Sequence, residues 1–209
     1  MKNYLIKTPT IFKAIYNRCI WHITEHANSV YITFDDGPHP EITPWVLAQL
    51  KQYNAKATFF CIGKNVVEHP EIYQQIIDEG HSVGNHTHNH YNGWKVSNAM
   101  YFKNIKTANE VIHSNMFRPP YGRITLAQAN GIKRLLPKSQ IIMWDVLSGD
   151  FDTELAPNEC LENVISTTKP GSIIVFHDSA KAFERLEFAL PNFLKYCQQN
   201  GWNMKKLNF

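Results

Sequence analysis

The sequence predicts an α/β protein, a single domain in which about seven parallel strands close into a (β/α) barrel. Short β-branched and aromatic runs alternate with longer stretches of helical periodicity along the 209 residues, which is typical of a parallel sheet. The unusual polar residues gather where the predicted strands end. No linker, repeat or low-complexity tract divides the chain, so one domain accounts for all of it.

The predicted strands are short runs rich in β-branched and aromatic residues, beginning with "VYITF". They cover residues 30–34, 57–63, 81–86, 116–120, 140–146, 172–177 and 202–207. Helical spacing of apolar residues predicts the segments between them, at 42–54, 65–80, 96–114, 125–136, 157–169 and 182–201. Within these helices, Ser97 is expected to be an N-cap, Gly131 a weak point and Pro191 a kink.

Periodicity alone leaves an open, doubly wound sheet as the alternative to a barrel. The polar residues favour the barrel, because the carboxyl ends of barrel strands converge on one site. Five predicted strands end in such residues. In chain order they are Asp35 and Asp36, His86 to His90, Arg118, Asp145 to Asp150, and His177.

Composition excludes several classes of protein. Hydrophobic residues make up 44% and charged residues 19% of the chain, which is typical of a globular domain rather than a disordered one. A formal net charge of +3 is too small for a nucleic-acid-binding protein. The four cysteines lack CxxC spacing, so neither a disulfide framework nor a cysteine-ligated zinc site is expected.

Residues 1–28 are predicted to form an amphipathic segment, read as a helix, packed on the domain of residues 29–209. The segment carries basic residues but lacks the apolar core and cleavage site of a signal peptide. Taken alone, it could also lie on a membrane surface. No stretch is long enough to span a membrane, so no transmembrane segment is expected. Because no signal peptide is seen, the sequence by itself indicates a cytoplasmic protein, and the location is left open.

The stretch "GNHTHNH" predicts a metal site. His86 and His90 are four residues apart, so on a helical turn they would project to one side, while His88 would point elsewhere. One carboxylate from another strand would complete three protein ligands. Three ligands leave an open position for water, as in catalytic zinc sites. A solvent-exposed histidine-rich loop is the alternative explanation.

The adjacent carboxylates of "YITFDDGPHP" supply that missing ligand. Asp35 and Asp36 would repel each other unless a cation offset their charges. One aspartate can bind the metal, and the other can act as a base toward the metal-bound water. Consecutive strand residues point to opposite faces, so the pair is expected where the strand has already turned, at Gly37 and Pro38.

Five motifs together resemble one family. "TFDDGP", "HTHNH", "RPPYG", "WDVLSGDF" and "VFHD" occur in the order found in the polysaccharide deacetylase family, also called the NodB homology domain or carbohydrate esterase family 4. The resemblance covers about residues 29–205. It implies a distorted (β/α) barrel that removes acetyl groups from N-acetylglucosamine polymers or acetylated xylan.

The resemblance also implies roles for residues at the first three motifs. Asp35 resembles the catalytic base, and Arg118 resembles the residue that orients it. Asp36, His86 and His90 resemble the metal ligands. Zinc is the expected ion for two histidines and an aspartate, although cobalt and nickel would also fit. A guanidinium can hold a carboxylate through two hydrogen bonds and keep it ionised, which agrees with the pairing of Arg118 and Asp35.

The last motifs resemble the remaining catalytic groups. His177 resembles the general acid and Asp150 its partner, and the backbone N–H of Tyr121 resembles an oxyanion donor. A carboxylate beside an imidazole favours the protonated ring that a departing amine needs. The residues expected to line the substrate groove are Trp144, Val175, Pro120 and Phe151.

Three residues depart from the family pattern and bear on the substrate. Leu147 stands where an acidic residue is common, Phe151 where Trp is frequent, and Val175 where Leu is frequent. The predicted activity is N-deacetylation of an amino-sugar glycan such as peptidoglycan, a chitin-like polymer or a surface polysaccharide, by a monomer that binds no nucleic acid. The alternatives are an O-acetyl esterase on acetylated xylan and a catalytically silent carbohydrate-binding protein. Family members often act on the cell envelope.

Overall fold

The computed structural model describes residues 4–25 and 27–209, and strands alternate with helices along them. The strands are β1 (Cys19–Ile20), β2 (Ser29–Asp35), β3 (Thr58–Cys61), β4 (Ser82–Asn85), β5 (Met116–Phe117), β6 (Gln140–Ile142), β7 (Val146–Leu147), β8 (Ile173–His177) and β9 (Asn203–Met204). The helices are α1 (Thr10–Ile15), α2 (Ile42–Gln52), α3 (Gly63–Glu68), α4 (Pro70–Asp78), α5 (Asn98–Asn109), the 3-10 helix η1 (Pro120–Gly122), α6 (Leu126–Leu135), α7 (Pro157–Thr167) and α8 (Phe183–Gln199).

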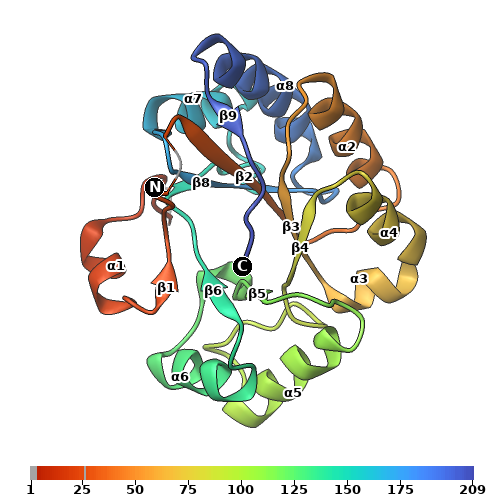
Figure 1. Ribbon diagram of the computed structural model, residues 1–209, viewed down its shortest axis with the longest axis vertical. Coiled ribbons are helices and arrows are strands. Elements are labelled where there is room, and N and C mark those ends of the chain that lie inside the picture. The colour runs from red at the N-terminus through yellow and green to blue at the C-terminus, as the bar shows by residue number, and fades with distance from the viewer. Residues whose placement is uncertain (1–3, 26) are drawn as a thin grey trace.

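The strands form one curled sheet, the deformed (β/α) barrel that the sequence predicts. Neighbouring strands follow the order β1-β6-β5-β4-β3-β2-β8-β7, with β9 beside β2, and these strand pairs are all parallel. Helices α2 to α8 surround the sheet (Figure 1). Because the strands are parallel, their carboxyl ends share one rim of the barrel, and most of the predicted polar residues lie at this rim. Asp145 is the exception, because it precedes β7 and accepts the hydroxyl of Ser172, which precedes β8.

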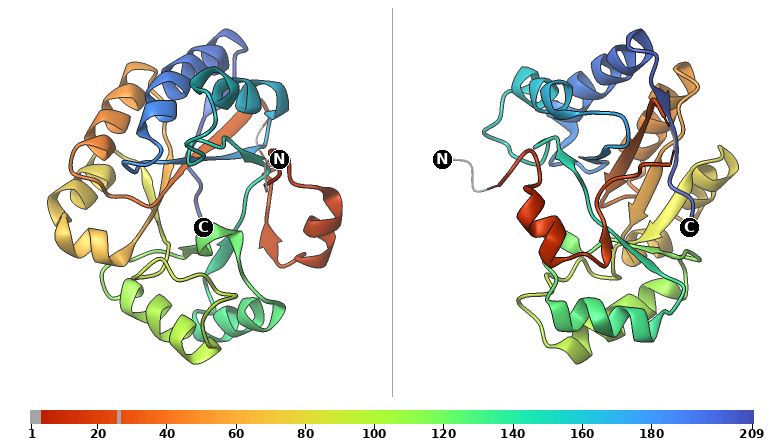
Figure 2. Two further views of the ribbon diagram at one scale, coloured as in Figure 1. Left: turned by 180° about the vertical axis from the view of Figure 1, so that it is seen from behind. Right: turned by 60° about the vertical axis from the view of Figure 1, so that its left-hand side comes forward.

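The N-terminal segment, residues 4–25, bridges the two edges of the curled sheet. The amide of Leu147 in β7 donates to the carbonyl of Ile6, and the amide of Met143 after β6 donates to that of Ile20. Figure 2 shows this segment in red beside the strands. The barrel is therefore closed by backbone hydrogen bonds to a crossing segment rather than by direct pairing of its edge strands.

Asp145, which precedes β7, binds the N-terminal segment through ion pairs. Its buried carboxylate forms ion pairs with Nζ of Lys7 and Nζ of Lys13, each at 2.5 Å. It also accepts a hydrogen bond from the hydroxyl of Ser172 at 2.9 Å. Burial alone would raise the pKa of Asp145, but the two lysines and Ser172 hold it below its usual value. The segment is thus attached by a buried charge as well as by backbone pairing.

The barrel interior is filled from below by the C-terminal segment. Leu207 is buried, and its amide donates to the hydroxyl of Thr58 at the start of β3. It packs in a cluster with side chains from five strands or their ends, namely Tyr31, Phe60, Met116, Ile142 and Ile173. The interior is therefore a packed core, and the open end is the rim that carries the polar residues.

A larger core lies between the outer face of the sheet and the helices. Phe34 in β2 stacks on Phe59 of β3 at 5.0 Å and on Phe176 of β8 at 6.2 Å, measured between ring centroids. These rings belong to the same buried cluster as residues of α2 and α8. Since strand side chains alternate between faces, Thr33 and Asp35 on either side of Phe34 point to the barrel interior.

Two predicted elements are broken in the structure. The strand expected at 140–146 is two strands, because residues 143–145 cross from β6, beside the edge strand β1, to β7 at the opposite edge of the sheet. The helix expected at 65–80 is two helices, α3 and α4, which meet at His69 and Pro70. Proline has no amide hydrogen and disfavours a helical residue before it, which explains the break. Together with β1, the divided strand raises the count from about seven to nine.

The N-terminal segment is less helical than predicted. Only residues 10–15 form a helix, and none of them is buried, so the segment packs through the residues on either side of α1. Residues 1–3 and 26 of this prediction lie outside the described residues. Ser97 is the predicted N-cap, with its hydroxyl accepting from the amide of Met100. No helix among residues 4–25 and 27–209 has the length and apolarity needed to cross a membrane.

Candidate active site

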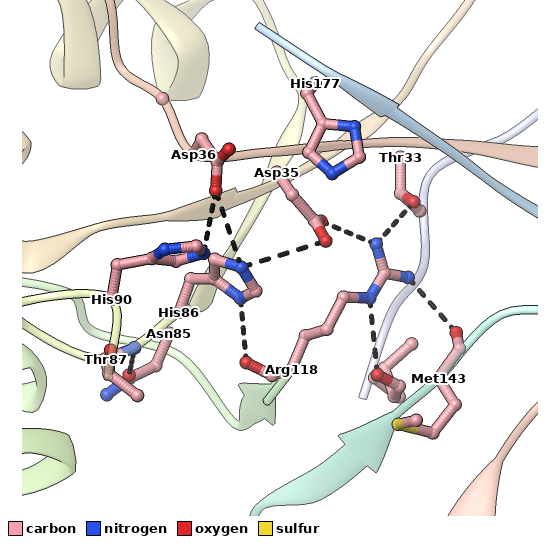
Figure 3. A network of polar contacts seen from close by, with 12 residues as sticks. Thr33, Asp35, Asp36, Asn85, His86, Thr87, His90, Arg118, Met143 and His177 are labelled. Atoms are coloured by element: carbon pink, nitrogen blue, oxygen red, sulfur yellow. Dashed lines mark hydrogen bonds and ion pairs between the residues drawn. The ribbon is translucent and has the colours of Figure 1, made fainter. Parts of the chain in front are cut away.

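Asp35 and Arg118 form a buried ion pair at the rim. Thr33 and Asp35 are two residues apart in β2 and share its inner face, where one guanidinium nitrogen of Arg118 reaches both. This nitrogen donates to the Thr33 hydroxyl at 2.6 Å and to Asp35 Oδ1 at 2.7 Å (Figure 3). The predicted contact is present, but through a single nitrogen, so Asp35 keeps its second oxygen for other partners.

The rest of the Arg118 side chain is fixed by the barrel interior. Its Nε and remaining amino group donate to the carbonyls of Ile142 and Met143, and the guanidinium lies 4.0 Å above the centre of the Phe60 ring. Burial lowers the pKa of Arg118, and the neighbouring Asp35 opposes that change. Because every nitrogen has an acceptor, Arg118 is a rigid cationic support beneath Asp35.

Asp36 leaves the strand through a left-handed backbone conformation. Its φ is 82°, which turns its side chain away from the alternation of β2. The following turn is fixed by Asp178, whose carboxylate accepts from the amide of Gly37 at 3.0 Å and from the hydroxyl of Thr43. A Cβ at Gly37 would lie 2.1 Å from this carboxylate, so only glycine fits there. Asp36 therefore sits at the turn, as predicted, whereas Asp35 is still the last residue of β2 and follows the strand alternation.

Three side chains converge in the way a metal site requires. His90 Nε2 lies 3.1 Å and His86 Nε2 3.7 Å from Asp36 Oδ1, and one ligand atom from each residue lies within 4.8 Å of the others (Figure 3). Asp36 Oδ1 is buried and accepts no hydrogen bond. A buried carboxylate oxygen without a donor, facing two imidazole nitrogens, fits a divalent cation at this point.

His86 is prepared to act as a ligand. Its Nδ1 lies 2.8 Å from the carbonyl of Arg118, so this nitrogen carries the proton and Nε2 is free to coordinate. Burial lowers the pKa of His86 to about 4, against the opposing charge of Asp35. The ring is therefore neutral at physiological pH, as metal coordination requires.

The loop that carries the histidines is irregular, which corrects the prediction of a helical turn. Thr87 and His90 have φ values of 64° and 55°, so residues 86–90 do not follow a helix. Amides of the loop donate to the side chains of Asn85 and Asn104, which fix its path. The spacing of four residues still brings His86 and His90 together, whereas His88 points toward Gly63.

His177 and Asp150 form the second buried pair. Asp150 Oδ1 lies 2.7 Å from Nδ1 of His177, and Asp150 Oδ2 accepts the backbone amide of His177 at 2.7 Å. Burial alone would lower the pKa of His177, but the charge of Asp150 and the hydrogen bond to it raise the pKa to about 10. His177 and Asp35 are register partners in β8 and β2, so the cationic ring stands beside the carboxylate.

The residues expected to line the groove lie around these pairs. Phe151 packs edge-on against His177, with the ring centroids 5.3 Å apart. The ring of Tyr121, whose backbone N–H is the predicted oxyanion donor, has its centroid 4.5 Å from that of His90. Trp144 lies near the Arg118 guanidinium at 5.9 Å and against Gly122. Pro120 and Val175 are buried, and Val175 shares the inner face of β8 with His177.

Three supporting residues were not singled out from the sequence. Thr33 shares the Arg118 nitrogen with Asp35, Asp178 fixes the turn after Asp36, and Arg185 of α8 donates from Nε to the carbonyl of Asp150. Thr33 could have been found, since it lies two residues before Asp35 on the same strand face. Arg185 carries no such signal, because its contact depends on how α8 docks.

Comparison with known proteins identifies the family. The family model described as "Polysaccharide deacetylase" matches residues 22–135. The chain belongs to the polysaccharide deacetylase family. A relative from Bacillus cereus, named peptidoglycan-N-acetylglucosamine deacetylase, is 37% identical over 157 residues, which are 72% of this chain and 56% of that protein. The match thus spans little more than half the length of that relative.

Two further comparisons cover more of each partner. A chitooligosaccharide deacetylase from Azorhizobium caulinodans is 34% identical over 163 residues, 75% of this chain and 76% of that protein. A crystal structure of a peptidoglycan N-acetylglucosamine deacetylase in complex with 4-naphthalen-1-yl-N-oxidanyl-benzamide superimposes with a TM-score of 0.86 at 30% identity, covering 96% of this chain and 95% of that one. The deformed barrel is therefore that of the family over nearly the whole chain.

Proposed function

We propose that this protein hydrolyses N-acetyl groups on an amino-sugar glycan. The observation that carries the proposal is that two ion pairs, each of one acidic and one basic side chain, lie beside one group of three candidate metal ligands. Asp35 with Arg118 supplies a carboxylate positioned by a guanidinium, and His177 with Asp150 supplies a protonated imidazole. Amide hydrolysis needs a base toward water and an acid toward the departing nitrogen, and the two pairs provide one of each.

Asp36, His86 and His90 would hold one divalent ion, and zinc suits their two nitrogens and one oxygen. When bound, such an ion polarises the acetyl carbonyl and makes water a better nucleophile. Asp35 takes the proton from that water, and Arg118 holds Asp35 Oδ1 without competing for its second oxygen. The predicted role of the Tyr121 N–H toward the carbonyl oxygen is part of the same proposal.

His177 delivers a proton to the leaving nitrogen. An amide anion is a far poorer leaving group than an alkoxide, so a ring held cationic by Asp150 is of greatest use in amide cleavage. This favours N-deacetylation over O-acetyl esterase activity. The presence of both Asp35 and His177 speaks against a catalytically silent carbohydrate-binding protein.

The names of the relatives support a substrate built from N-acetylglucosamine, as peptidoglycan or as chitin-type oligomers. Trp144, Val175, Pro120 and Phe151 are proposed to contact this glycan. The monomeric state and the cytoplasmic location stay predictions from the sequence.

The proposal is tested by measuring acetate release from a panel of acetylated glycans. The panel holds chitin oligomers, peptidoglycan fragments and acetylated xylan, each with metal, with a chelator, and with zinc restored after chelation. We expect acetate and free amine from the N-acetylated glycans, lost with chelator and recovered with zinc. Release from xylan alone would support the esterase, and release from no member would contradict the proposal.

A further inference from the structure

Trp94 is exposed on the rim at a point that the catalytic residues do not occupy. Its side chain is 56% exposed, whereas the other four tryptophans of the chain are half-buried. Burying a large aromatic surface is strongly favourable, so an indole held in water on an ordered loop is a candidate contact for a ligand.

The loop that carries Trp94 is rigid. Gln128, only 1% exposed, donates from Nε2 to the carbonyl of Gly93 at 2.7 Å and accepts the amide of Thr125 on Oε1. A Cβ at Gly93 would lie 2.5 Å from the carbonyl of Arg123, so the two loops touch through a position where only glycine fits. The amide of Trp94 donates to Asn92 Oδ1. The indole is therefore presented in one position.

Arg123 covers part of the indole. Its guanidinium lies 4.3 Å from the ring centroid, a cation–π contact that fixes the plane of the indole. A shallow, open depression lies beside the ring between the starts of α5 and α6. Its lining residues are Tyr16, Gly93, Trp94, Val96, Asn98, Thr125, Leu126 and Gln128. The site thus combines one exposed aromatic face with amide and hydroxyl groups.

This surface is continuous with the candidate active site. Trp94 follows the metal-ligand candidate His90 by four residues, which limits their Cα separation to about 14 Å. Arg123 follows Tyr121 by two residues, and the exposed Tyr121 ring lies 4.5 Å from the His90 ring. A glycan of a few rings with one acetyl group at the triad would therefore reach Trp94 without leaving the rim.

We propose that Trp94, held by Arg123 and Gly93, is a distal subsite that stacks on a pyranose ring of the glycan. The apolar face of a pyranose presents C–H bonds with partial positive charge, which complement the electron-rich face of an indole. Hydroxyl and acetamido groups of the same ring find polar partners in the depression, at Asn98 and Thr125. The inference rests on the proposed glycan deacetylase function and adds that longer chains bind more tightly.

The test compares turnover of N-acetylglucosamine oligomers, from the monomer to the hexamer, by wild type, Trp94→Ala and Trp94→Phe. Phe188→Ala is the matched control, because Phe188 is a 42% exposed aromatic on α8. We expect KM of Trp94→Ala to rise about tenfold for the long oligomers, with kcat and the shortest substrates unchanged. Trp94→Phe should keep part of the affinity, and Phe188→Ala should match wild type.

A binding readout separates this inference from the proposed function. The hexamer is titrated into Asp35→Asn, which tests affinity without turnover, with and without Trp94→Ala. Tighter binding of the hexamer than of the dimer, lost on Trp94→Ala, would support the subsite. Equal binding by both variants would overturn the subsite and leave the deacetylase proposal standing. Absence of acetate release from every glycan by wild type would instead overturn the proposed function.

Discussion

Replacing Asp150 by Asn should move the pH range in which the enzyme works. Asn has nearly the same shape and can still accept the His177 backbone amide, but it removes the charge that holds the ring cationic. Asp150 is the largest influence raising the pKa of His177 to about 10, and burial acts in the opposite direction. Without Asp150, burial is opposed only by the charges of Asp35 and Asp36, so the pKa of His177 is expected to fall toward its ordinary value of about 6.5.

The size of the effect follows from the protonated fraction of His177. At pH 8 a group with a pKa near 10 is almost fully protonated, whereas one with a pKa of 6.5 is protonated to about 3%. If His177 is the general acid, kcat at pH 8 should fall by up to about thirtyfold in Asp150→Asn. The basic limb of the profile should shift to lower pH, because the cationic ring is lost earlier as pH rises. A bound cation would lower the pKa in both proteins, so the difference between them remains.

The assay is acetate release from a chitin oligomer between pH 5 and pH 10, with zinc present throughout. Asp152→Asn is the control, because Asp152 is on the same loop but accepts from Tyr4 instead of His177. Its profile should match wild type. Melting temperatures measured over the same pH range separate loss of catalysis from loss of fold. A basic limb that stays in place in a folded Asp150→Asn protein would refute the role of Asp150.

Three further predictions test the surroundings of the site. Gly37→Ala places a Cβ against the Asp178 carboxylate, so zinc affinity should fall more than tenfold by calorimetry as Asp36 is displaced. His88→Gln should leave zinc affinity within about twofold, since His88 lies outside the ligand group; a larger loss would make His88 a ligand. Asp145→Asn should destabilise the protein to urea by roughly 2 kcal/mol, because two lysines lose their buried partner. The lowered pKa of Asp145 means that wild type keeps this stability above about pH 4 and loses it as pH falls further. The difference in unfolding free energy between wild type and Asp145→Asn should therefore shrink in acid.

The sequence was most informative where local chemistry determines structure. The parallel sheet and the convergence of Asp35, Asp36 and the histidines follow from strand periodicity and from polar residues at strand ends. The pairing of His177 with Asp150 was also predictable, since adjacent strand ends meet at one rim. The break in the helix expected at 65–80 also follows from local chemistry, because Pro70 disfavours a helical residue before it.

Other features depend on contacts distant in the sequence. The crossing of residues 143–145 from one edge of the barrel to the other cannot be distinguished from a continuous strand by periodicity. The irregular loop at residues 86–90 is fixed by Asn85 and by Asn104 in α5, so its backbone was not foreseeable from the histidine spacing. The sequence alone does not distinguish Trp94 from the other tryptophans, because its exposure and the hydrogen bond from Gln128 to Gly93 depend on the fold.

Asp35→Asn tests the central claim most directly, because it changes one oxygen of the proposed base and nothing in the metal triad. Zinc content by elemental analysis and acetate release from a chitin oligomer are measured on the same purified samples of wild type and variant. The account predicts equal zinc in both proteins and a loss of kcat of about 10²–10⁴ in Asp35→Asn. Normal acetate release by the zinc-loaded variant would contradict it.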